Sequence, residues 1–107
     1  MENIIALNFH LDIENSSLSL SLMREALDRL EELEEAGIPV EFFELRAGNP
    51  KPGQSRKKIY IKIDSSTRTF TDTESAPEWL EAFDKVFDRV FDRFLCCREE
   101  EKIFSRN

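Results

Sequence analysis

Hydrophobic and polar residues alternate at the start of the chain. In residues 4–13 one side carries only large apolar residues: Ile5, Leu7, Phe9, Leu11 and Ile13. Polar or small residues fill the positions between them. A period of two is typical of a strand with one buried face, so this stretch predicts a half-buried β-strand.

The period then changes to that of a helix. From about Leu20, apolar residues recur three and four positions apart: Met23, Ala26, Leu27, Leu30 and Leu33. The candidate N-caps are three serines: Ser17, Ser19 and Ser21. Gly37 suits the left-handed position after a helix, Ile38 can pack on the last turn, and Pro39 blocks continuation. The helix should therefore end near Ala36.

Three further strands follow. Residues 40–46 (VEFFELR) place an aromatic residue on each face, which is typical of an interior strand. Residues 47–55 (AGNPKPGQS) predict a loop because glycine and proline interrupt regular structure. Residues 56–64 alternate again, with three isoleucines inward, and a short strand is expected at residues 67–71.

A long helix should close the chain. Residues 75–78 (SAPE) form a capping box, and the helix is expected from Ala76 to about Glu99. A tetrad repeated three times produces one apolar band: Phe83, Val86, Phe87, Val90, Phe91 and Phe94. Such a helix is longer than the strands, so residues 96–107 should overhang the sheet or fray. The phenylalanine band also offers a homodimer interface, with a core role as the commoner alternative.

These elements predict an α+β fold of order βαβββα in one domain spanning residues 1–107. The simplest arrangement is a mostly antiparallel four-stranded sheet with both helices packed on one face. A chain of 107 residues with 40% hydrophobic residues supports one compact core.

Charge is distributed unevenly along the chain. The net charge is −7, which excludes a globally cationic protein that coats nucleic acid. The first helix carries an acidic stripe at helical spacing: Glu25, Asp28, Glu32 and Glu35. This stripe is a solvated helix face, a docking face for a basic protein or a mimic of a phosphate backbone. On the last helix, acidic and basic residues alternate at helical spacing and predict a self-neutralising solvent face.

Residues 47–71 are basic within this acidic chain. They hold one acidic residue and six basic ones: Lys51, Arg56, Lys57, Lys58, Lys62 and Arg68. Tyr60 adds an aromatic ring on the outer face of the strand. This basic hairpin could contact phosphate groups, with Tyr60 stacking on a base. The alternative is a charged strand that prevents edge pairing.

The sequence offers little catalytic chemistry. His10 is the only histidine, and Cys96 and Cys97 are adjacent, so no metal site, catalytic triad or cofactor is expected. Two adjacent cysteines form a poor disulfide, which favours a reducing, cytoplasmic setting. No apolar run is long enough to span a membrane, and no signal peptide is indicated.

The order of elements resembles two RNA-associated families. From residue 18 onward, the chain resembles the double-stranded-RNA-binding domain, including residues 37–41 (GIPVE) and 48–50 (GNP). With the first strand included, the order is similar to the ribosome hibernation-promoting family, residues 69–94 taking the place of the last strand and helix. These resemblances imply the fold and association with structured RNA or the ribosome. Where the RNA-binding domain has a lysine-rich helix start, residues 73–78 (TESAPE) are acidic here.

We therefore expect a small non-catalytic interaction protein of the inhibitor, immunity, anti-defence or adaptor type. It would bind a macromolecular partner through the acidic stripe. The alternative is a ribosome- or RNA-associated protein that uses the basic hairpin.

Overall fold

The computed structural model describes residues 4–48 and 56–104, with side chains described as far as Cys97. Four strands and two helices follow the expected order: β1 (Ala6–Asp12), α1 (Ser16–Glu35), β2 (Val40–Gly48), β3 (Lys57–Ser65), β4 (Thr69–Ala76) and α2 (Trp79–Phe104). The α+β prediction is therefore confirmed.

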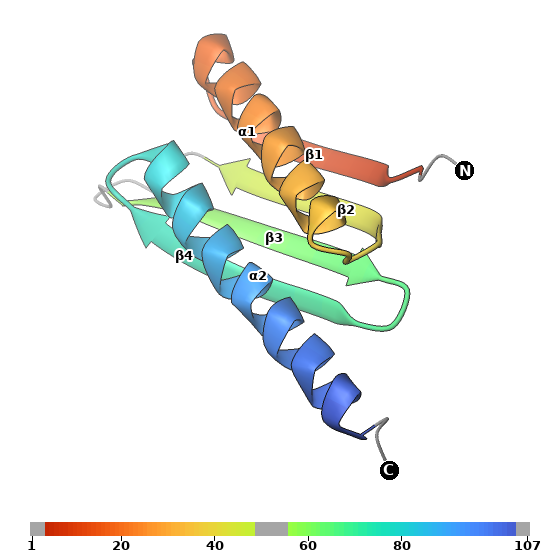
Figure 1. Cartoon of the computed structure of the whole chain (residues 1–107). Coiled ribbons are helices and arrows are strands. Elements are labelled where there is room, and N and C mark those ends of the chain that lie inside the picture. The colour runs from red at the N-terminus through yellow and green to blue at the C-terminus, as the bar shows by residue number, and fades with distance from the viewer. Residues whose placement is uncertain (1–3, 49–55, 105–107) are drawn as a thin grey trace.

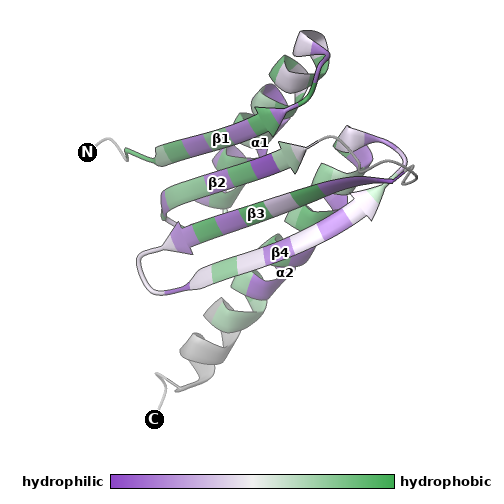
Figure 2. Cartoon of the chain, turned by 180° about the vertical axis from the view of Figure 1, so that it is seen from behind, coloured by the Kyte–Doolittle hydropathy of each residue, from purple (hydrophilic) through white to green (hydrophobic). Residues whose placement is uncertain are grey.

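The strands form one mixed sheet in the order β1-β2-β3-β4. β1 and β2 are parallel because α1 carries the chain back across the sheet between them, whereas β2–β3 and β3–β4 are antiparallel. Both helices lie on one face (Figure 1), and the opposite face carries no helix (Figure 2). The molecule is thus a two-layer structure with one bare sheet face.

The core lies between the helices and the sheet. Its largest fully buried side chains come from both helices and the two central strands: Phe43, Phe83, Phe87, Leu22, Leu33, Leu45, Ile59, Ile61 and Ile63. The inward isoleucines of β3 are as predicted. On α1, Leu22 is buried, whereas Leu27, expected in the core, is 48% exposed. The buried stripe is therefore rotated slightly from the predicted one.

Capping explains where α1 begins and ends. Asn15 is the N-cap, and its side-chain oxygen accepts hydrogen bonds from the amides of Ser17 and Leu18. The prediction of a serine cap and a start near Leu20 was therefore wrong. At the other end Gly37 has a φ of 83°, and the amides of Gly37 and Ile38 donate to carbonyls of the last turn. The predicted glycine stop is confirmed.

The boundary between β4 and α2 differs from the prediction. Residues 75 and 76, expected to open the helix, belong to β4, and α2 begins at Trp79. The strand was underestimated because Asp72 and Glu74 occupy inward positions of its alternating pattern, facing the helix layer. Both carboxylates bind Arg89 of α2, which makes an inward acidic residue compatible with a strand.

The last helix extends beyond the sheet; residues 105–107, which were expected to overhang or fray with it, lie outside the described residues. It has 26 residues and is about 39 Å long, whereas strands of seven to nine residues reach about 23–30 Å. Figure 1 shows its C-terminal turns projecting past β4. Within the described residues, neither helix combines the length and apolar character needed to cross a membrane.

Candidate interaction surfaces

The acidic stripe predicted on α1 does not form one continuous surface. Asp28, Glu32 and Glu35 are exposed, but Glu25 is half-buried against α2. There its carboxyl group faces that of Asp84. Glu25 therefore belongs to the contact between the helices, and three members of the stripe remain available to a partner.

The contact with Asp84 changes the acidity of Glu25. The hydrogen bond to Asp84, followed by burial and by repulsion from the Asp84 charge, raises the pKa of Glu25 to about 7. Arg29 opposes this rise and Asp28 adds weakly to it. One of the two facing carboxyl groups must carry a proton for the hydrogen bond to form, so the helix contact is sensitive to pH near neutrality.

Arg29 forms the second link between the helices. Its guanidinium group contacts Asp88 of α2, lies 3.4 Å from Glu32 and sits 4.9 Å from the ring centre of Phe87. The one basic residue in the middle of the stripe is thereby turned toward α2. It partly neutralises Glu32 and Asp88 but not the outer positions of α1.

Two arginines of α2, Arg89 and Arg93, are likewise turned toward β4. Arg89 binds Asp72 at 3.0 Å, contacts Glu74, and donates to the Thr73 carbonyl at 2.7 Å. Arg93 lies 3.8 Å from Asp72. The predicted self-neutralising face is therefore wrong for Arg89, which neutralises β4. Among the side chains described on α2, only Lys85 pairs along its own helix, with Glu81 at 3.2 Å.

Arg89 contributes to lowering the pKa of both Asp72 and Glu74 on β4. Burial would raise the pKa of Asp72, but hydrogen bonds from Arg89 and the Thr73 amide outweigh it and lower the pKa. A hydrogen bond from the Ser75 amide, then one from Arg89, lowers the pKa of Glu74. Arg89 is thus committed to a structural ion-pair cluster.

These pairings leave an acidic outer surface on the helix layer. We define the acidic helix surface as the exposed carboxylates that face outward from α1 and α2: Asp28, Glu31, Glu32, Glu35, Asp88 and Asp92. Among the described residues, four of them have no ion pair: Asp28, Glu31, Glu35 and Asp92. Sequence reasoning missed Glu31, Asp88 and Asp92, since their role depends on where the arginines turn.

The basic hairpin does not form a single patch. Lys57 faces the helix side and lies 3.6 Å from Glu78, whereas Arg56 donates to the Ser75 carbonyl at 2.7 Å. Arg68 lies in the turn at the far end of β3, and Lys51 falls outside the described residues. The structure brings together only the central part of this prediction, Lys58 and Lys62 with Tyr60 between them.

Those three residues lie on the bare face of the sheet. Arg46 of β2 stands opposite Tyr60, its guanidinium carbon 5.7 Å from the ring centre, and Lys62 lies 5.8 Å from the ring centre of Phe42. Phe42 and Arg46 were missed as candidates, although their even-numbered spacing from Glu44 in VEFFELR places them on one face.

Negative charge is also present on this face. Glu44 is buried although no helix covers it, because Arg46 hydrogen-bonds its carboxylate at 2.6 Å and His10 lies 3.8 Å away. His10 is exposed on β1 as expected for a surface residue. The bare face therefore combines aromatic rings with charges of both signs.

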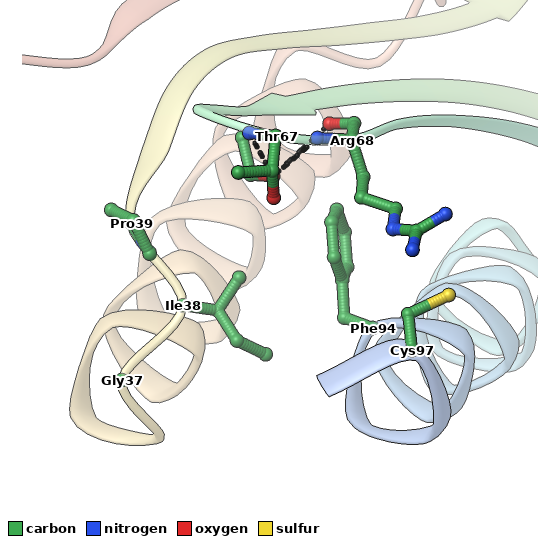
Figure 3. Close-up of a pocket in the computed structure, with 8 residues that line it drawn as sticks. Gly37, Ile38, Pro39, Thr67, Arg68, Phe94 and Cys97 are labelled. Atoms are coloured by element: carbon green, nitrogen blue, oxygen red, sulfur yellow. Dashed lines mark hydrogen bonds between the residues drawn. The ribbon is translucent and has the colours of Figure 1, made fainter. Parts of the chain in front are cut away.

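A small hollow lies where the end of α1 meets the β3–β4 turn and the overhanging part of α2 (Figure 3). It has a volume of about 100 Å³ and is lined by Ile38, Phe94 and Cys97 among others. The Ser65 hydroxyl beside it accepts hydrogen bonds from the Thr67 and Arg68 amides, so it is used in the turn. Cys96 and Cys97 are free thiols.

The described residues contain no cluster of three side chains able to hold a metal ion.

The band of α2 that was considered for dimerisation is occupied within the chain: Phe83, Phe87 and Phe94 are buried, and Phe91 packs partly against the core. The three buried rings therefore form part of the core rather than of the exposed surface.

No protein-family model matches the chain, and no curated protein matches its sequence.

Proposed function

We propose that this protein is a non-catalytic binding protein whose acidic helix surface docks on a basic protein partner. The observation that carries the proposal is the orientation of the arginines. Arg29 turns into the helix contact, where it pairs with Glu32 and Asp88, and Arg89 turns onto β4, so neither pairs with Asp28, Glu31, Glu35 or Asp92.

The arrangement suits electrostatic recognition. Asp28 and Glu35 lie two turns apart on the outer side of α1, and Asp92 lies on the outer side of α2. Carboxylates on two packed helices present charge over a rigid area, which steers a basic partner and restricts its orientation. A protein that uses this surface as an inhibitor, immunity protein or adaptor needs no catalytic residues.

Affinity capture with charge variants tests this proposal. The bait Asp28→Lys/Glu35→Lys reverses two outer charges, and the control Glu14→Lys/Glu41→Lys makes the same change in net charge at exposed positions away from the surface. We expect a basic protein to be captured by the wild-type and control baits and lost from the Asp28/Glu35 bait. Capture by all three baits alike would refute the proposal.

A second candidate function is binding of structured RNA on the bare sheet face. It is favoured by Tyr60, which stands between Lys58 and Lys62 on an uncovered strand and so pairs a stacking ring with two phosphate-binding cations. The test is a gel shift with structured RNA at low and high salt, comparing wild type with Lys58→Glu/Lys62→Glu. We expect a low-salt shift that the variant loses; no shift at low salt would reject this function.

A further inference from the structure

The two edges of the sheet are treated differently. On β4, the outward backbone groups are capped by side chains of the same chain. The Thr73 amide donates to Asp72 at 2.8 Å and its carbonyl accepts from Arg89 at 2.7 Å. The Ser75 amide donates to Glu74 at 3.0 Å and its carbonyl accepts from Arg56 at 2.7 Å. This edge is closed to strand addition.

The pairing across the sheet shows which groups face outward at the other edge. The backbone amide and carbonyl of Thr73 point away from β3, so those of its partner Tyr60 point toward β2. The backbone groups of Arg46, which pairs with Tyr60, point back toward β3. The backbone groups of the neighbouring residue, Leu45, therefore point toward β1. Leu45 lies opposite Phe9 and hydrogen-bonds to the residues before and after Phe9. The β1 residues that direct both amide and carbonyl to the free edge are therefore Leu7, Phe9 and Leu11.

This free edge is uncapped and apolar. Among the described residues, no side chain hydrogen-bonds the outward backbone groups of β1. Leu7 is 43% exposed, although its side chain points to the helix side of the sheet. On α1, Leu20 and Leu27 are 62% and 48% exposed, and helical geometry places them about 160–180° from Arg29, on the flank opposite α2.

We propose that β1 pairs antiparallel with β1 of a second copy of this chain, joining the two sheets into one of eight strands. In a two-fold pairing centred on Phe9, three hydrogen-bonded pairs form: Phe9 with Phe9, and Leu7 with Leu11 twice. Both helix layers then lie on the same face. Leu7 becomes covered, and the flank of α1 with Leu20 and Leu27 faces the junction.

The strand is self-complementary in this register. His10 stands opposite Asn8 of the second copy, and Asp12 stands opposite Ala6, so no like charges oppose each other. β1 also lacks lysine and proline, the residues that commonly protect edge strands. A second copy therefore satisfies the backbone groups and the apolar side chains together. This inference does not depend on the proposed function.

Light scattering coupled to size-exclusion chromatography tests the dimer. We expect the full chain to show twice its 12.5 kDa mass at high protein concentration. Leu7→Lys should raise the dimer dissociation constant at least about tenfold, because an edge lysine opposes strand addition. Leu80→Lys is the matched control, since Leu80 is similarly exposed at 38% but lies on α2, and it should remain dimeric. Circular dichroism would verify that both variants fold.

Cysteine cross-linking tests the register. In a background with Cys96→Ser and Cys97→Ser, Asn8→Cys/His10→Cys should form an intermolecular disulfide, because residues 8 and 10 of the two copies face each other in a non-hydrogen-bonded pair. Asn8→Cys alone should not cross-link. A wild-type monomer at high concentration, a dimer unaffected by Leu7→Lys, or equal cross-linking of both cysteine variants would each overturn the proposal.

Discussion

Individual arginines decide which surface of this protein is acidic. Arg89 could pair with carboxylates along its own helix, but it instead binds Asp72 and Glu74, which occupy inward positions of β4. Two half-buried carboxylates without a cation would carry a desolvation cost, so the arginine stabilises the fold where it is. The outer face of the helix layer keeps its negative charge as a consequence.

Glu25 makes stability depend on pH. Its pKa of about 7 in the folded protein exceeds its ordinary value of 4.5, so the folded chain binds this proton more tightly than the unfolded chain. The contribution of Glu25 to the free energy of unfolding is therefore fully present below about pH 4.5 and is lost as the pH rises through about 7. Glu25→Gln can donate a hydrogen bond to Asp84 at every pH.

We expect Glu25→Gln to raise the free energy of unfolding by about 1 kcal/mol above pH 7 and to have little effect at acid pH. Urea denaturation across this pH range measures it. Glu35→Gln, at an exposed position of the same helix, is the control and should leave the pH dependence unchanged. An equal pH dependence in wild type and Glu25→Gln would show that this carboxyl pair does not couple the helices to pH.

At the scale of elements, the periodicity of apolar residues correctly predicts which faces of β3 and α2 pack in the core. The alternating isoleucines of β3 and the apolar band of α2 are in the core as predicted. The predictions fail where a polar residue occupies an inward position because it binds a partner that is distant in the sequence. Asp72 and Glu74 interrupt the apolar pattern of β4, and only the folded structure brings Arg89 to them. At the start of α1, the N-cap is Asn15 and not one of the nearby serines.

The end of α1 gives a matched test of backbone geometry. Gly37 has a φ of 83°, whereas Gly48 has no positive φ and has open space where a side chain would begin. Gly37→Ala should therefore lower the free energy of unfolding by about 1–2 kcal/mol, because an L-residue is strained in this conformation. Thermal or urea unfolding of both variants measures the difference. Equal stability of Gly37→Ala and Gly48→Ala would contradict this explanation of the helix end.

At the scale of the molecule, the sequence indicates the candidate surfaces only in part. Spacing along α1 correctly groups Asp28, Glu32 and Glu35, but it cannot show that Glu25 turns toward α2. Likewise, the basic hairpin is continuous in sequence but divides between two sheet faces and two strand ends in the structure. Which charges share a surface depends on strand parity and helix rotation, and these are set by tertiary packing.

The most direct test of the central claim is the dissociation constant of the captured partner, measured by isothermal titration against two variants of equal net charge. We expect Asp28→Lys/Glu35→Lys to weaken binding by more than about tenfold, since two attractive contacts become repulsive. Glu14→Lys/Glu41→Lys should bind as the wild type does. Unchanged affinity for the first variant, or an equal loss for both, would contradict the assignment of the acidic helix surface as the binding site.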